Sequence, residues 1–285
     1  MLLRSVGYER PATLHDALAA LGSSEQARVL AGGQSLINVL KHRVADCDLL
    51  VDISRLEPLE FIEVAQNGTT EIGAAVTYDE LDRSTALREA HPVVANVAAS
   101  TVDQQVRCRG TIGGNACYND PSSNFPPLLV ALRATMHIAS PQGDRSVPAE
   151  DFFHGPFDTA VEQGELLRAI SLPPLDGQGV GYSSILLAED SWALARACSV
   201  LRCNGDVQEA RVVLGCVGPR PLRAHAVEQR LQGSQLSAEA LAGACAGAGD
   251  DLSPVSDVHA SAEYRREMAA VVTRRAVLQA AEISS

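Results

Sequence analysis

The amino-acid sequence predicts an α+β protein built from more than one compact part. Helix and strand patterns alternate over the first part of the chain, which favours a parallel α/β unit. Short strands around turn dipeptides dominate the middle, and a hairpin followed by helices closes the sequence. With 285 residues and 46% hydrophobic composition, the chain is long enough to bury the cores of two domains.

The first predicted helix covers residues 14–21, with Thr13 as its N-terminal cap. An apolar strand at 28–31 then leads into a glycine pair, and a helix is expected at 35–43. A second short buried strand is expected at 49–53. A strand, a helix and a strand in that order predict two parallel neighbouring strands.

The middle of the chain is predicted to form hairpins and helices. Strands at 61–65 and 71–76 flank Asn67-Gly68, a dipeptide typical of tight turns. Gln142-Gly143 separates a second pair of strands in the same way. The further elements expected up to residue 172 are helices at 77–81, 91–100 and 121–132, strands at 135–139 and 144–147, and a strand at 166–172.

A Pro- and Gly-rich stretch at 173–181 predicts a boundary between a first domain, residues 1–175, and a second, residues 178–285. Within the first domain, the change of pattern near Pro58 separates subdomains at 1–57 and 58–175. In the second, Asn204-Gly205 lies between two apolar runs and predicts a β-hairpin. The strands of this hairpin are expected at 193–203 and 207–217, and helices at 221–231, 237–246 and 261–281.

Charge and cysteine content limit the binding partners, the location and the redox state expected for the chain. The formal net charge of −12 argues against nucleic acid and anionic membrane surfaces, because both require a basic face. No stretch has the pattern of a secretory signal or the apolar length of a membrane span, so a cytoplasmic location is expected. The seven cysteines include no C-x-x-C pair, which favours reduced thiols. Cys198 and Cys203 are expected to flank a hairpin turn.

Two Gly-Gly pairs, Gly32-Gly33 and Gly113-Gly114, are the only ones in the chain. Glycine amides can approach a phosphate closely and tolerate positive φ, so two such loops could hold the two halves of a diphosphate. After the first pair, Ser35 could cap the following helix or bind phosphate. Taken alone, the first pair favours an ordinary strand-to-helix turn with Ser35 as its N-cap over a phosphate site, because Gly-Gly turns are common.

The second loop offers more polar groups. Thr111 supplies a hydroxyl, the two glycines are expected to present bare amides, and Asn115 supplies a side-chain amide. Asp120 could accept a hydrogen bond from a ribose hydroxyl or an adenine amine, or could cap a helix beginning near Pro121. The G-x-G-x-x-G and P-loop fingerprints are absent, and no catalytic or metal-binding constellation is present in the sequence.

Three stretches, 31–36, 50–53 and 111–115, closely resemble the FAD-binding medium subunit of molybdenum-containing hydroxylases. That family includes the carbon monoxide dehydrogenase flavoprotein and the FAD segment of xanthine dehydrogenase. The likeness extends over nearly the whole chain, from the opening pattern at Tyr8 to the helix beginning at Ser261. Each motif alone is modest, but their order and spacing together are specific.

The resemblance implies a vanillyl-alcohol-oxidase (PCMH)-type FAD-binding fold of two α/β subdomains, followed by a small C-terminal α+β domain. It also implies which residues contact the FAD. Those residues are Ala31, Gly32, Gly33, Gln34, Ser35 and Leu36 in the first loop, Thr111, Ile112, Gly113, Gly114 and Asn115 in the second, and Asp120 and Tyr182 further along.

The resemblance further implies an electron-transfer subunit with FAD on this chain. The molybdenum cofactor is expected in a large subunit and two [2Fe-2S] clusters in a small subunit, with electrons leaving through FAD to an external acceptor. A heterohexamer, formed as a dimer of heterotrimers, is the expected assembly. The chain departs from the family pattern at 183–190, where members commonly carry a lysine and further basic residues.

The sequence leaves two alternative functions open. One is a self-contained FAD-dependent oxidase with its own substrate pocket. The other is a scaffold subunit that has lost FAD, which the altered 183–190 stretch keeps in view. The substrate of the complex is open between carbon monoxide, a purine, an N-heterocycle and an aldehyde.

Overall fold

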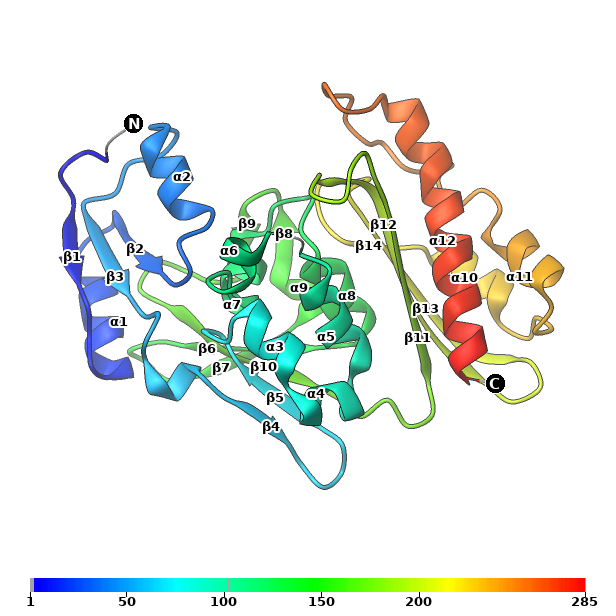
Figure 1. Ribbon diagram of the computed structural model, residues 1–285, viewed down its shortest axis with the longest axis horizontal. Coiled ribbons are helices and arrows are strands. Elements are labelled where there is room, and N and C mark those ends of the chain that lie inside the picture. Colours follow the sequence, from blue (N-terminus) through cyan, green and yellow to red (C-terminus); the bar gives the residue numbers. More distant parts are fainter. Residues whose placement is uncertain (1–2, 102, 285) are drawn as a thin grey trace. The chain divides into compact units, whose positions relative to one another are not determined.

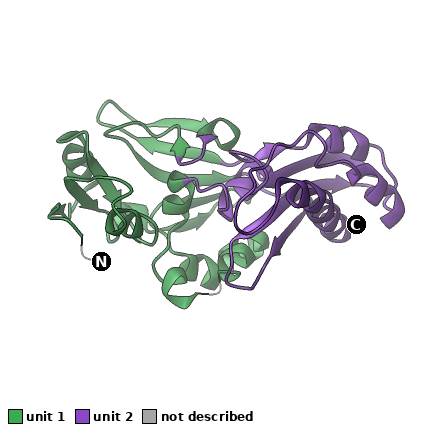
Figure 2. Cartoon of the chain, turned by 90° about the horizontal axis from the view of Figure 1, so that it is seen from above, with its two compact units in different colours: residues 1–118, 135–152, 158–172 green, residues 119–134, 153–157, 173–285 purple. Residues whose placement is uncertain are grey.

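A computed structural model describes residues 3–101 and 103–284, and the chain divides into two compact units (Figure 2). Unit 1 comprises Met1–Tyr118, Thr135–Phe152 and Asp158–Leu172. Unit 2 comprises Asn119–Ala134, Phe153–Phe157 and Pro173–Ser285. Two segments that lie between parts of unit 1 in the sequence are therefore built into unit 2. No helix within the described ranges is both long and apolar enough to cross a lipid bilayer.

Unit 1 begins with a parallel three-stranded sheet in the order β1 (Gly7–Glu9), β3 (Leu49–Asp52), β2 (Ala27–Leu30). The expected parallel α/β arrangement is confirmed. Its helices are α1 (Leu14–Gly22) and α2 (Leu36–Lys41).

The hydroxyl oxygen of Thr13 accepts a hydrogen bond from the Asp16 backbone, so Thr13 caps α1 as predicted. Strand β1 was not predicted, because three exposed residues carry no readable alternation. The core beneath this sheet is aliphatic: Ala17, Leu21, Val51 and Leu59 are almost fully buried.

The second sheet of unit 1 is antiparallel, in the order β4 (Ile62–Val64), β5 (Thr70–Gly73), β10 (Leu166–Leu172), β6 (Thr135–Ala139), β7 (Arg145–Pro148). The strand and turn predictions for this region are confirmed, with Gly68 at a φ of 82° in the first turn. The other elements of unit 1 are η1 (Glu57–Leu59), α3 (Tyr78–Arg83), α4 (Thr85–Ala90), α5 (Pro92–Ala99), α6 (Gln104–Arg107), α7 (Ile112–Tyr118), α9 (Ala149–Phe152) and β9 (Asp158–Thr159).

One expectation for unit 1 is wrong. The pair Gly113-Gly114 lies in the first turn of α7, not in a loop. The helix forms there because the Thr111 hydroxyl accepts the Gly114 N–H at 3.0 Å, which satisfies an amide at the helix N-terminus.

Unit 2 is built on an antiparallel sheet in the order β11 (Gly179–Leu186), β12 (Ala193–Cys203), β13 (Val207–Gly215), β14 (Leu222–Arg223). Asn204-Gly205 forms the predicted turn between β12 and β13, with Gly205 at a φ of 78°. The other elements of unit 2 are α8 (Phe125–Ala131), β8 (Phe153–Gly155), α10 (His225–Leu231), α11 (Ala238–Cys245) and α12 (Ala262–Ser284).

Three details of unit 2 correct the sequence predictions. The helix expected from residue 121 begins only at Phe125, because residues 120–123 form a separate turn. Strand β11 starts inside the stretch 173–181, which the sequence predicts to be a domain boundary. Cys198 is buried in the middle of β12 opposite Val213, so only Cys203 lies beside the hairpin turn.

The long helix α12 lies across β11 and β12 (Figure 1), and two glycines permit this close packing. A Cβ atom added to Gly179 would lie 1.9 Å from the Ala280 carbonyl oxygen, and one added to Gly181 would lie 1.9 Å from that of Ala276. Both distances are far below van der Waals contact. Glycine is therefore required at both positions for the helix backbone to reach the strand.

We expect Gly181→Ala to destabilise the protein by about 2 kcal/mol, because the added methyl group must push α12 away from β11. The measurement is the free energy of unfolding in urea. The matched control is Gly243→Ala within α11, where an added Cβ has nothing within 4 Å. That variant should be stabilised by about 0.5–1 kcal/mol through helix propensity. Equal effects of the two substitutions would contradict the packing argument.

Candidate functional site

The two glycine segments, far apart in the sequence, are joined in unit 1. A Cβ added to Gly32 would lie 1.8 Å from the Arg109 carbonyl oxygen and 3.0 Å from Gly110 Cα. In addition, Arg109 Nε donates a hydrogen bond to the Gly32 carbonyl oxygen at 3.3 Å. The sequence interpretation required these two segments to lie together, and they do.

The first segment follows β2 and leads into α2. Within the described part of the chain, the backbone N–H groups from Gly32 to Leu36 have no hydrogen-bond acceptor. Ser35 is the residue before the helix, but its side chain makes no capping bond. Gly33 has a φ of 71°, a conformation that glycine adopts without strain. Consecutive unsatisfied amides at a helix start form a site suited to an anion such as phosphate.

The second segment is arranged differently, and the expectation of bare amides there is wrong. The Gly113 N–H donates to the Ala74 carbonyl oxygen at 3.0 Å, and the Gly114 N–H donates to the Thr111 hydroxyl. A Cβ added to Gly113 would lie 2.5 Å from both the Cβ and the carbonyl oxygen of Ala74. These contacts hold α7 against the residues that follow β5. The second segment therefore supplies anchoring, and its side chains are the groups left for a ligand.

Asn115 presents such a group. Its Oδ1 atom is buried and has no hydrogen-bond partner in the described chain. Its side chain also hydrogen-bonds to Tyr78, whose pKa is raised by burial to about 12. A buried acceptor without a donor is costly, so Oδ1 is placed to accept a hydrogen bond from a bound molecule. Tyr78 was missed by sequence reasoning, because no local pattern links it to a residue on α7.

Asp52 lies at the carboxyl end of β3, opposite Leu30, the residue that ends β2 just before the first segment. Its Oδ2 atom accepts a hydrogen bond from the Tyr8 hydroxyl at 2.5 Å, and its Oδ1 atom accepts one from the Ser54 N–H at 2.9 Å. Burial alone would raise the pKa of Asp52, but these hydrogen bonds and the nearby Arg10 outweigh it and lower the pKa. The cluster links β1 to β3, the strand that pairs with β2.

Asp120 and Tyr182 belong to unit 2, and the structure shows local partners for both. Asp120 Oδ1 accepts from the Ser122 N–H at 2.8 Å and from the Ser122 hydroxyl at 2.6 Å, so Asp120 forms a turn and does not cap α8. The Tyr182 hydroxyl donates to the Asn124 carbonyl oxygen at 3.1 Å, and the Arg196 guanidinium lies 5.6 Å from the ring centroid. Their assignment to FAD stays a prediction.

The chain matches two protein-family models in succession. Residues 4–175 match the FAD-binding domain of molybdopterin dehydrogenases, and residues 182–280 match the C-terminal domain of the CO dehydrogenase flavoprotein. The carbon monoxide dehydrogenase medium chain of Afipia carboxidovorans is 38% identical over 284 residues, with 98% of each chain covered. The glyceraldehyde dehydrogenase medium chain of Sulfolobus acidocaldarius is 35% identical over 275 residues, covering 96% of this chain and 98% of that protein.

Solved structures agree with these matches. A chain of carbon monoxide dehydrogenase from Hydrogenophaga pseudoflava, in a form without the Mo-pyranopterin moiety, superposes with a TM-score of 0.95 at 34% identity. The match covers 99% of both chains. The fold and the matched models define a flavoprotein with an FAD-binding domain. The chain belongs to the FAD-binding medium subunits of molybdenum hydroxylases, which are parts of multi-subunit oxidoreductases.

We expect Asp52→Asn to lower the free energy of unfolding by about 2 kcal/mol at neutral pH, because a buried, hydrogen-bonded carboxylate is lost. The pKa of Asp52 is lowered in the folded state, so its contribution is present above the ordinary carboxyl pKa and is lost as the pH falls through the folded value. The difference between the variant and the unaltered chain should therefore shrink in acid.

Urea unfolding at a series of pH values measures this difference. The control is Asp46→Asn, because the Asp46 side chain is 67% exposed and pairs with Arg4 at the surface. Its effect should stay below about 1 kcal/mol. A gap between Asp52→Asn and the unaltered chain that does not change with pH would contradict the proposed role of the Asp52 charge.

Proposed function

We propose that this chain binds FAD non-covalently between its two joined glycine segments and serves as the electron-transfer subunit of a molybdenum hydroxylase complex. The observation that carries the proposal is the row of unsatisfied amides from Gly32 to Leu36, joined to the segment that bears Asn115. A buried acceptor and a set of free donors together fit a ligand that has both an anionic group and hydrogen-bond donors.

The residues present fit the parts of FAD. The amides of residues 32–36 and the Ser35 hydroxyl would hold the diphosphate, which offers only acceptors at neutral pH. Backbone N–H dipoles can bind a diphosphate without a basic patch, even in a chain of net charge −12. The Asn115 Oδ1 atom would accept from a hydroxyl or N–H group of the cofactor, since a diphosphate has no donor to give it.

FAD, when bound, supplies the ability to accept electrons and to release them to an external acceptor. The task of this chain is to bind and orient the cofactor. The anchored amides of Gly113 and Gly114 keep α7 in place, and the Tyr8–Asp52 hydrogen bond links β1 to β3, the strand that pairs with β2 before the first segment. Thr111, Ile112, Asp120 and Tyr182 are further proposed contacts of the cofactor.

We infer that the electrons come from [2Fe-2S] clusters of a small subunit, which receive them from the molybdenum cofactor of a large subunit. The relatives support this assignment of roles, because medium chains 38% and 35% identical to this one belong to enzymes named for carbon monoxide and for glyceraldehyde. A subunit shared by different substrates serves the step that those reactions have in common. A dimer of these heterotrimers in the cytoplasm is the proposed assembly.

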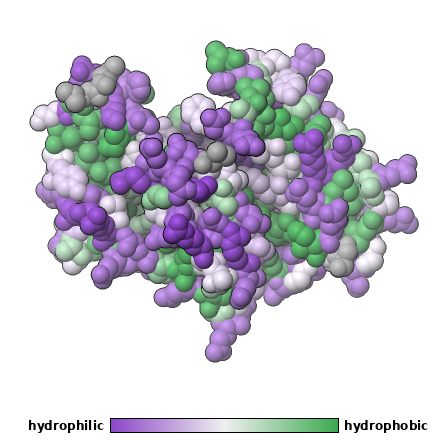
Figure 3. Space-filling model, in the orientation of Figure 1, coloured by the Kyte–Doolittle hydropathy of each residue, from purple (hydrophilic) through white to green (hydrophobic). Residues whose placement is uncertain are grey.

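Exposed apolar side chains in unit 2 support a bound partner. Leu187 and Trp192 lie on the connection between β11 and β12 and are 59% and 71% exposed. Val255 and Val258, in the segment before α12, are 78% and 94% exposed. Figure 3 shows apolar residues at the surface around this end of α12. Such groups mark protein contact surfaces when they gather.

Arg265 brings the two segments to the same end of unit 2. Its guanidinium donates to the Leu194 carbonyl oxygen at 2.8 Å and pairs with Asp257 Oδ2 at 2.7 Å. The side chain of Arg265 is buried, so it acts as an internal link between the start of β12 and the segment that carries Val258. We propose this end of unit 2 as a contact surface for another subunit of the complex.

Gly32→Ala should lower the FAD content of the purified protein at least about tenfold, because the methyl group would separate the two segments that hold the cofactor. Flavin absorbance per protein chain measures the result. Gly22→Ala, at the end of α1 with nothing within 4 Å of an added Cβ, should keep its flavin. Full flavin content in Gly32→Ala would contradict the proposed site, and an unaltered chain that never carries flavin would support the scaffold alternative.

The tagged chain, purified from its native host under mild conditions, should carry molybdenum and iron together with flavin. Trp192→Ser should lower the recovered metals about tenfold while the flavin per chain stays constant, because a large aromatic contact is lost. Val44→Ser, at a residue of unit 1 that is 77% exposed, is the control. Purification without either metal would contradict the complex, and substrate turnover by this chain alone would favour a self-contained oxidase.

A further inference from the structure

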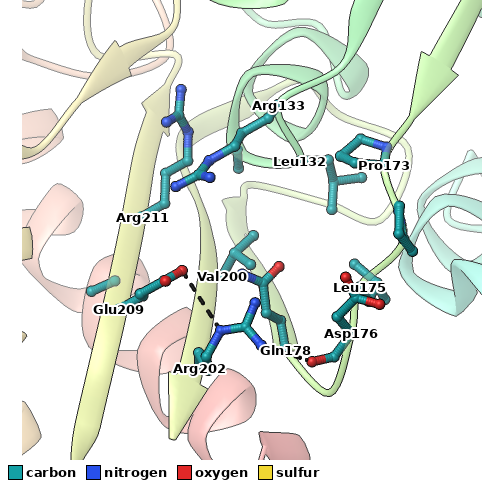
Figure 4. Close-up of a pocket in the computed structure, with 13 residues that line it drawn as sticks. Leu132, Arg133, Pro173, Leu175, Asp176, Gln178, Val200, Arg202, Glu209 and Arg211 are labelled. Atoms are coloured by element: carbon teal, nitrogen blue, oxygen red, sulfur yellow. Dashed lines mark hydrogen bonds and ion pairs between the residues drawn. The ribbon is translucent and has the colours of Figure 1, made fainter. Parts of the chain in front are cut away.

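A pocket of about 260 Å³ lies within unit 2, among β12, β13, the turn after α8 and the segment 173–178 (Figure 4). Three arginines from three different segments line it: Arg133, Arg202 and Arg211. Only two acidic residues, Asp176 and Glu209, are among the lining residues. In a chain of net charge −12, this is a local excess of positive charge.

Arg202 has two partners within the pocket. Its Nε atom lies 3.7 Å from Glu209 Oε2, and its Nη1 atom donates to the Asp176 carbonyl oxygen at 3.0 Å. Figure 4 shows these residues grouped at one side of the pocket. The Glu209 carboxylate therefore offsets part of the charge of Arg202, and Asp176 contributes a backbone acceptor.

Arg133 and Arg211 are held together by one backbone group. The Val130 carbonyl oxygen accepts a hydrogen bond from the backbone N–H of Arg133 at 3.2 Å and another from the side-chain Nε of Arg211 at 3.0 Å. Figure 4 shows the two side chains extending toward one another. Within the described chain, the guanidinium of Arg133 has no hydrogen bond or ion pair. Two converging guanidinium groups repel each other, and an anion between them removes that repulsion.

The backbone conformation of Arg133 is one that favours glycine over arginine. It has a φ of 55°, in the left-handed region, immediately after the last turn of α8. The Ala134 N–H donates to the Leu129 carbonyl oxygen at 2.9 Å, which together with the Arg133 bond completes a Schellman motif. Glycine is the residue favoured at this position. Arginine is unfavourable for this backbone conformation. We infer that its side chain is kept for a function.

The remaining wall is apolar and includes Leu132, Pro173, Leu175 and Val200. The pocket is also larger than inorganic phosphate requires, although it is smaller than most drug-sized sites. We propose that this pocket binds a small organic oxyanion, with a phosphate or carboxylate group between Arg133 and Arg211 and a compact apolar body against the proline segment. Arginine forks match both oxyanions in geometry. None of the residues that line the pocket is among the proposed FAD contacts.

The test uses the FAD-loaded complex and three probes: phenyl phosphate, benzoate and inorganic phosphate. Isothermal titration should show binding of phenyl phosphate or benzoate, and binding at least about tenfold tighter than that of inorganic phosphate because of the apolar wall. Arg133→Gly should weaken the binding about tenfold, because a charged hydrogen-bonding partner is lost. Its melting temperature should equal or exceed that of the unaltered complex, because glycine suits the left-handed turn.

Arg220→Ala is the matched control, since it removes one exposed arginine of unit 2 that does not line the pocket. It should leave the affinity for the probes unchanged. The proposal is overturned if neither organic probe binds, if inorganic phosphate binds as tightly as both, or if Arg133→Gly binds as tightly as the unaltered complex. An equal loss in Arg220→Ala would also overturn it, because the effect would then be one of net charge. Weaker binding in Arg133→Gly alone, without loss of stability, supports it.

Discussion

The contact between Gly32 and the Arg109 carbonyl oxygen is the constraint on which the candidate site depends. An added Cβ at this position would lie 1.8 Å from that oxygen, so only a residue without a side chain allows the contact. The contact brings the end of a parallel strand together with a segment that leads into α7. This contact brings the free amides of the first segment and the segment that bears the buried Asn115 acceptor into one site.

The two glycine segments have similar composition but opposite roles. The amides of residues 32–34 stay free because they lie in the loop before α2, and the Leu36 amide stays free because a helix cannot satisfy its own first N–H groups. The amides of Gly113 and Gly114 are used within the protein, by Ala74 and by Thr111. One segment is thus fixed firmly so that the other can present its donors to a ligand. Such preorganised donors require no rearrangement when an anion binds.

Close backbone approach through glycine also builds unit 2, where Gly179 and Gly181 let α12 approach β11. Arg133 is the reverse case, because a large charged residue occupies a turn position where glycine is favoured. Positions that break a local rule are expected at functional sites, since the cost must be offset by a gain elsewhere. The exposed Trp192 and Val258 lie on the surface that we propose as a contact for another subunit, which would bury them.

The sequence by itself determined the local elements and the family. The Thr13 cap, the Asn204-Gly205 turn and the strand at 166–172 are confirmed, because each depends on residues that are neighbours in the chain. The resemblance also identified the flavoprotein family, and the two matched family models confirm it.

Only the tertiary structure decided how the glycine pairs are used. No local pattern distinguishes the free amides after Gly32 from the bonded amides at Gly113, because the acceptor at Ala74 comes from a distant segment. Tyr78 could not be predicted for the same reason, because it contacts Asn115 only when α3 and α7 fold together. Caps and turns depend on residues adjacent in the sequence, whereas the hydrogen bonding of a buried polar group depends on the whole fold.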